Sequence, residues 1–149
     1  MALATAAITI LIDNIISALN TAAIEGIVGV YFGDQESFSA YPVICVGAPP
    51  LLNEKFPVMA GQVIRDETYN IPILLYVEYA DTLANNKLLY NLTCAIMTAL
   101  RKEYFWDAVL GKNFVYQIEI LQTRYVFAQK GDVTLRISET TIQYKKRIS

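Results

Sequence analysis

The sequence predicts an α+β domain, an antiparallel or mixed sheet of about four strands with two helices packed on one face. Two patterns lead to this class. Apolar residues recur at helical spacing over 8–19 and 88–100, and period-2 alternation marks the segments 71–79 and 115–144. The expected order is helix, strand, long arm and strand, helix, strand, strand. With 149 residues, the chain fits a single domain spanning 1–149.

The first helix is expected over residues 8–19, because its apolar residues follow the i, i+3, i+4, i+7 spacing of a helix with one buried side. These residues are Ile8, Leu11, Ile12, Ile15, Ile16 and Leu19. Gly26 and Gly29 lie where we expect the helix to stop. Alanines on its other positions would allow another element to approach closely.

Three extended pieces are expected before the second helix. Residues 30–32 begin a short one, and 41–46 form a strand of mostly β-favouring residues. A long arm over 51–68 is expected to run into the strand 71–79, whose two faces are both fairly apolar. Pro72 indicates either the start of that strand or an edge position, because proline donates no ladder hydrogen bond.

Asp81 is expected to cap the second helix, and Arg101 and Lys102 suit the negative end of its dipole. Its expected buried stripe consists of Leu88, Leu89, Leu92, Ala95, Ile96, Ala99 and Leu100. A hairpin then closes the chain, turning at Gly131. The apolar phase slips once in each of its strands, so we expect a bulge or bend in each.

A transmembrane span is not expected. The first apolar run ends at Asp13, and the run 71–77 contains Pro72 and stops at Glu78, whereas a span needs about 20 apolar residues. No Lys or Arg precedes the first run, so it does not resemble a signal peptide. Hydrophobic residues nevertheless make up 54% of the chain and charged ones 17%. We therefore expect an intracellular oligomer whose subunit contacts cover the apolar excess.

The arm and three strand arginines are the contact candidates. Phe56 and Met59 are too apolar for a free solvent loop, so a neighbour is expected to cover them. Arg65, Arg124 and Arg136 lie in or beside expected strands, where arginine extends its head to solvent or pairs with a carboxylate. Across a subunit contact the candidate partners are acids of the next copy, namely Asp66, Glu67, Glu119 and Glu139. Asp66 and Glu67, at the end of the arm, are therefore contact candidates as well.

The residues offer little for catalysis. The chain contains no histidine, which removes the common nucleophile pairs and the HExxH zinc site. Phosphate-cradling and nucleophile-elbow motifs are absent. Cys45 and Cys94 are expected to be two small buried side chains. A net charge of −2 creates no field that attracts nucleic acid, and the basic run 145–147 is expected to be solvated. We expect no enzyme activity, no cofactor and no metal.

The whole pattern resembles the tail terminator or tail-completion (neck) proteins of tailed bacteriophages. The resemblance lies in the amphipathic helix 8–19, the strand 41–46, the arm leading into the strand 71–80, the helix directly after Asp81, and the closing hairpin that ends at 141–145. It covers nearly the whole chain and depends on the order of elements.

This resemblance implies a structural virion protein, assembled in the host cytoplasm, that forms a ring and caps the head-proximal end of the tail tube. The ring, commonly a hexamer, stops tube polymerisation and docks the head-side connector. The arm and the closing hairpin would make the ring and tube contacts. A slightly acidic protein also suits a lumen through which DNA slides without specific binding.

Three other functions stay open at this point. A head-completion protein of similar fold would bind the portal side instead. A small-ligand module or enzyme would need a pocket near Tyr76, Tyr90 and Tyr125, with polar groups drawn from Glu78, Glu119 and Arg124. A monomeric adaptor or toxin would bind one host protein through an exposed apolar arm.

Overall fold

A computed structural model of the chain describes residues 7–35, 38–47, 66–79, 83–101, 106–107, 112–113 and 117–147, with 66–69 and 144–147 among those described by backbone alone. The elements are α1 (Ala7–Ala22), β1 (Gly29–Phe32), β2 (Val43–Val46), β3 (Asp66–Glu78), α2 (Leu83–Arg101), β4 (Trp106–Asp107), β5 (Lys112–Asn113), β6 (Gln117–Lys130) and β7 (Val133–Arg147). The predicted contact residues Phe56, Met59 and Arg65 lie outside the described residues, as does most of the predicted arm.

Five of these strands form one mixed sheet in the order β1-β2-β3-β7-β6. β1 pairs with β2 in parallel, and the other neighbours are antiparallel. The predicted α+β class is confirmed, with five strands in place of about four. The two-residue strands β4 and β5 pair separately, which the sequence pattern did not predict.

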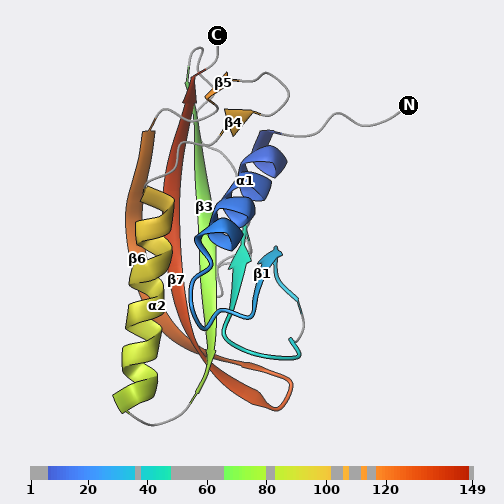
Figure 1. The fold of residues 1–149 in the computed structure, drawn as a ribbon, viewed down its shortest axis with the longest axis vertical. Coiled ribbons are helices and arrows are strands. Elements are labelled where there is room, and N and C mark those ends of the chain that lie inside the picture. The colour runs from blue at the N-terminus through green and yellow to red at the C-terminus, as the bar shows by residue number, and fades with distance from the viewer. Residues whose placement is uncertain are drawn as a thin grey trace, which may run out of the picture.

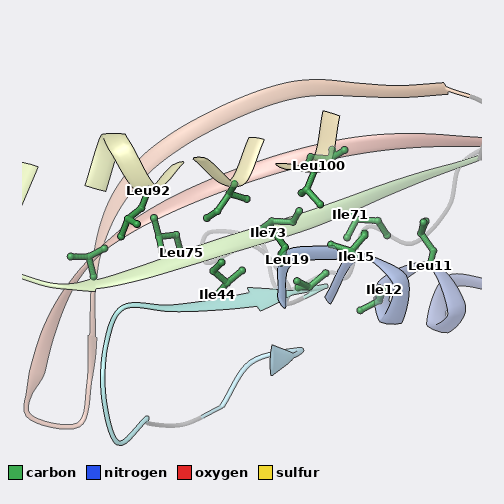
Figure 2. Packing of buried hydrophobic residues seen from close by; sticks show 14 of the residues in the cluster. Leu11, Ile12, Ile15, Leu19, Ile44, Ile71, Ile73, Leu75, Leu92 and Leu100 are labelled. Atoms are coloured by element: carbon green, nitrogen blue, oxygen red, sulfur yellow. The ribbon is translucent and has the colours of Figure 1, made fainter. Parts of the chain in front are cut away.

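Both helices cover the same face of the sheet (Figure 1). α1 packs on β1 and β2, α2 packs on β6 and β7, and the two helices touch each other. Between them and the sheet lies an apolar core in which the helix side chains point at alternate residues of β3 (Figure 2). Its members include Leu11, Ile12, Ile15, Leu19, Ile44, Ile71, Ile73, Leu75, Leu92 and Leu100.

Two helix details differ from the sequence expectation. α1 ends at Ala22, before either glycine, because Ala23 adopts a left-handed conformation with φ 49°. In α2, Leu88 is 39% exposed, although it was expected in the buried stripe. α2 is oriented so that Leu89, Leu92, Ile96 and Leu100 face the sheet. Leu88 therefore falls on the border between the buried stripe and solvent.

The opposite face of the sheet carries a second apolar cluster, which neither α1 nor α2 covers. The sheet curls, and the β6–β7 hairpin bends toward the connection between β1 and β2 (Figure 1). Buried Val43, Cys45, Leu74 and Tyr76 lie inside this curl with residues of β6 and β7 next to the hairpin turn. Phe38 and Tyr41, from the β1–β2 connection, pack on them.

Pro72 lies in the middle of β3, a central strand, which corrects the expectation of a strand start or an edge. The partner strand explains why it is tolerated. β2 ends at Val46, opposite Ile73, and the amide of Gly47 donates a 2.8 Å hydrogen bond to the Pro72 carbonyl. The proline nitrogen points toward the same side, where β2 has already ended, so no ladder hydrogen bond is lost.

The two phase slips of the closing hairpin have different causes. In β6 the register with β7 shifts between Ile120 and Gln122, so Leu121 is the extra residue of a bulge, as predicted. β7 runs in unbroken register along β3, so of the bulge or bend expected in that strand, a bulge is excluded. Its apolar pattern changes phase because Ile137 is buried on the curled face, whereas Ile142 is buried under the helices.

Candidate assembly surface

The outward side of α2 carries a continuous exposed stripe. Its residues follow the i, i+4, i+7, i+11 spacing of one helix side, and the side toward α1 carries alanines instead. Leu83, in the first turn of the helix, is 70% exposed. The α2 stripe consists of Leu83, Lys87, Tyr90, Cys94 and Arg101.

The α2 stripe continues onto the sheet through two aromatic pairs. Tyr90 contacts Tyr125 of β6 edge-to-face, with ring centroids 5.0 Å apart. Tyr79, directly after β3, contacts Phe127 of β6 in the same way at 5.5 Å. All four rings are exposed, Phe127 to 62%. We call these four residues the aromatic strip.

Arg136 of β7 connects the two parts of this surface, because it contacts both β6 and α2. Its guanidinium lies 5.1 Å from the Phe127 ring centroid, a cation–π distance, and donates a hydrogen bond to the side-chain carbonyl of Asn86. Burial raises the pKa of the Tyr125 hydroxyl, with Cys94 and Tyr90 adding to the effect. Tyr125 therefore stays neutral in the physiological range. The strip is thus an apolar surface with fixed ring geometry.

β6 also forms one edge of the sheet. It is 14 residues long and follows β7 at the end of the strand order, so its outer backbone groups have no neighbouring strand among the residues described. Such an edge is a ready template for pairing unless a partner, a charge or a bulge protects it. Here the bulge at Leu121 interrupts the edge, and the aromatic strip lies beside its second half.

Those predicted contact residues that the structure describes do not converge on one site. Arg136 belongs to the surface just described. Arg124 points to the curled face and pairs with Glu139, which is 6% exposed, within the same chain. Asp66 and Glu67 lie in β3, where the backbone register places them opposite Arg147 and Lys146 of β7. The acidic positions and the basic run near the C-terminus are therefore cross-strand neighbours.

A polar clasp closes the curled face. Lys130, at the tip of β6, donates hydrogen bonds of 3.1 Å to the Asp34 carboxylate and 2.6 Å to the Gln35 carbonyl. Its ammonium also lies 5.2 Å from the ring centroid of Tyr76. Burial, and then the negative charge of Asp34, raises the pKa of the Tyr76 hydroxyl and raises that of the Cys45 thiol to about 12. Both groups stay neutral, so the Lys130–Asp34 pair supplies the charges of this clasp.

The geometry does not form the small-ligand pocket considered above. Tyr76 lies on the curled face, whereas Tyr90 and Tyr125 meet on the helix side of the sheet. Glu78 and Glu119 are exposed. No three potential metal ligands come together within the described ranges, and none of the helices described there has the length and apolarity to cross a membrane. Cys45 is buried as expected, but Cys94 is exposed.

The aromatic strip was not predicted, although its signal is present in the sequence. Leu83, Lys87, Tyr90 and Cys94 repeat at helical spacing on the side opposite the buried stripe. Tyr125 and Phe127 occupy alternate positions of the same face of β6. What the sequence does not carry is that α2 packs over β6, which brings the two patterns together.

Comparison with models of known protein families finds no match to this chain, and comparison with curated protein sequences finds no relative.

Proposed function

We propose that this chain is a structural subunit of a bacteriophage virion. Copies of it assemble in the host cytoplasm into a ring, a hexamer, on the head-proximal end of the tail tube. The ring stops tube polymerisation by covering the last tube subunits, and its other side docks the head-side connector. DNA passes through the lumen without specific binding.

The aromatic strip beside the outer edge of β6 is the observation that carries this proposal. Tyr79, Tyr90, Tyr125 and Phe127 are exposed together, and aromatic residues are enriched where proteins meet. The rings are already held by edge-to-face contacts and by Arg136, so little conformational freedom is left to lose on docking. A surface of this kind supports an assembly role.

Two further features agree with the proposal. The order of helices and strands, with the closing hairpin, is the order on which the resemblance to tail terminators depends. The chain has a net charge of −2, and a lumen without excess positive charge does not hold phosphates. The experiment below therefore has to distinguish binding at the tube end from binding at the connector side.

Tube growth in the presence of the chain tests the proposal. Tail tube protein of the phage that encodes the chain is polymerised with increasing amounts of purified chain, and tube lengths are measured by electron microscopy. We expect shorter tubes that carry a ring at one end. Unchanged lengths with bare ends, or binding to the portal assembly without binding to tubes, would contradict the proposal.

A pair of variants of β6 connects the activity to the aromatic strip. Phe127→Gln removes the most exposed ring of the strip, and we expect it to weaken capping because the contact surface loses an aromatic anchor. Gln122→Ala is the matched control. It alters an exposed position on the opposite face of the same strand and should cap like the unmodified chain. Circular dichroism confirms that both variants are folded.

A further inference from the structure

Arg136 carries a charge that no carboxylate balances among the residues that the structure describes. Its side chain is half-buried, it donates a hydrogen bond to the neutral side-chain carbonyl of Asn86, and its guanidinium lies against the ring of Phe127. The Nε atom is buried and has no hydrogen-bond partner. A cation held away from water in this way costs stability unless an acid pairs with it.

Arg124, on the neighbouring strand β6, shows the paired arrangement. Its Nε atom is likewise buried without a partner, but its Nη2 atom donates to the carboxylate of Glu139 in the same chain. These two side chains lie on the curled face. Arg136 lies on the other face, because it is opposite Val77, a member of the helix-covered core. Of these two strand arginines, Arg136 is therefore the one that lacks its acid.

The described acids near Arg136 are directed elsewhere. Side chains alternate between the two faces of a strand. Glu78 and Glu119 each follow or precede a residue that packs in the helix-covered core, so both project to the curled face. Asp132 lies in the hairpin turn, and α2 contains two basic residues and no acid. Within the described ranges, the counter-ion of Arg136 is left to a partner molecule.

The aromatic strip surrounds this charge with rings. Phe127 is 62% exposed and lies 5.1 Å from the Arg136 guanidinium, and Tyr79 packs edge-to-face on Phe127. A partner that covers these rings excludes water, which strengthens a charge pair formed beneath them. Arginine and aromatic residues are enriched together where proteins meet. The surface thus combines an apolar contact area with one unpaired positive charge.

We propose that a tail tube subunit docks on the aromatic strip and pairs one of its aspartate or glutamate side chains with Arg136. The carboxylate accepts hydrogen bonds from guanidinium N–H groups that Asn86 does not use. A neutral or basic segment would cover the rings and leave Arg136 unpaired, so the charge selects an acidic partner surface. The inference rests on the proposed function and names the chemical group by which the tube end is recognised.

Supplying the missing carboxylate within the chain is the test. Asn86→Asp places an acid where Arg136 already donates a hydrogen bond, with almost no change of shape. We expect the free chain to unfold at a higher urea concentration, because a neutral acceptor becomes a charged one. Binding to tail tubes should weaken at least about tenfold, since Arg136 is then paired before the partner arrives. Co-sedimentation with tubes over a concentration series measures this binding.

Ala84→Asp is the matched control. It adds the same charge to the same first turn of α2, so any effect of the helix dipole is shared by both variants. Residues two positions apart do not face the same side of a helix, and Ala84 is exposed. This variant should bind tubes like the unmodified chain, and its gain in stability should be smaller than that of Asn86→Asp. Circular dichroism confirms that both variants are folded.

Removing the cation gives a second measurement that needs no tubes. Arg136→Met keeps the aliphatic length and deletes an unpaired charge, so its urea midpoint should change no more than in an ordinary surface substitution. Arg124→Met leaves the buried carboxylate of Glu139 without its cation, so its midpoint should fall clearly. An equally large fall in Arg136→Met would make Arg136 a structural residue and overturn the proposal. With tubes, Arg136→Met should bind at least about tenfold more weakly.

The outcomes separate this inference from the proposed function. If the unmodified chain caps tubes and Asn86→Asp binds them equally well, the carboxylate contact is overturned while the ring function stands. If light scattering shows that Asn86→Asp weakens association between copies and leaves tube binding intact, the acid belongs to a second copy, and the tube contact is again overturned. An unmodified chain that does not bind tubes at all would contradict both.

Discussion

The two faces of the sheet are stabilised by different means. Under the helices, Leu11, Ile15, Ile73 and Leu89 pack in a core whose members are all apolar. On the curled face, the apolar cluster is smaller, and the chain closes it with the Lys130–Asp34 pair. The helix-covered face is therefore stabilised mainly by apolar area, with hydrogen bonds between Thr123 and Thr140 and from Arg136 to Asn86 beside its core. The curled face is closed by a pair of opposite charges. Substitutions on the two faces should differ in size and in their response to pH and salt.

The largest effect is expected in the helix-covered core. Leu89→Ala removes a fully buried side chain, and we expect it to lower the free energy of unfolding by about 2–5 kcal/mol because a cavity remains. Leu88→Ala, the neighbouring exposed position, should change it by roughly 0.5 kcal/mol or less. Urea denaturation measures both, and equal losses would show that α2 does not pack in the described rotation.

The next effect concerns the ion pair on the curled face. Glu139→Gln leaves the guanidinium of Arg124 without its carboxylate, and we expect a loss of about 1–3 kcal/mol, smaller than for a fully buried pair because Arg124 is one-third exposed. The matched change Glu119→Gln, on an exposed carboxylate, should be close to neutral. An unchanged free energy of unfolding in Glu139→Gln would mean that the ion pair makes no net contribution to stability.

A pH dependence is expected from the buried thiol. Burial raises the pKa of Cys45 from 9.0 to about 12, so the folded chain keeps a proton that the unfolded chain releases. The resulting stability is complete below pH 9 and is lost as the pH rises toward 12. Between pH 8 and 10, the free energy of unfolding should fall by about 1.4 kcal/mol more in the unmodified chain than in Cys45→Ala.

Cys94→Ala is the control for that comparison. It removes the exposed thiol and leaves Cys45 in place, so it should keep the full fall of the unmodified chain. If the free energy of unfolding fell as steeply with pH in Cys45→Ala as in Cys94→Ala, the buried thiol would not be the group that titrates.

The smallest effect is expected at the clasp. Lys130→Met keeps the aliphatic part of the side chain but removes the charge facing Asp34, and we expect a loss of about 0.5–1 kcal/mol because the pair is partly exposed. The loss should shrink in high salt, which screens the pair. Lys87→Met, on the exposed side of α2, should leave stability unchanged. Equal melting curves for the two variants would show that the Lys130–Asp34 pair does not stabilise the fold.

Sequence patterns predicted the helix-covered face well because its signals are local. The spacing of Leu11, Ile12 and Ile15 determines which side of α1 is buried, and the phase slip at Leu121 marks a bulge within its own strand. Such features depend on residues a few positions apart. They can be read without knowing which elements are neighbours.

The curled face and the candidate surface could not be predicted in the same way, because they depend on contacts between distant segments. Lys130 meets Asp34 only because the hairpin bends over the sheet. Pro72 fits a central strand only because β2 ends one residue earlier. Likewise, Tyr90 and Tyr125 form part of one strip only because α2 packs over β6. No periodicity within a segment carries this information.

The mass of the unmodified chain in solution tests the central claim, that this protein works as a ring of copies, most directly. Light scattering after gel filtration is carried out over a concentration series, with and without tail tubes. We expect a discrete closed oligomer, six times the mass of one chain, either at high concentration or on the tubes. A single-chain mass under every condition, with no ring on the tubes, would contradict it.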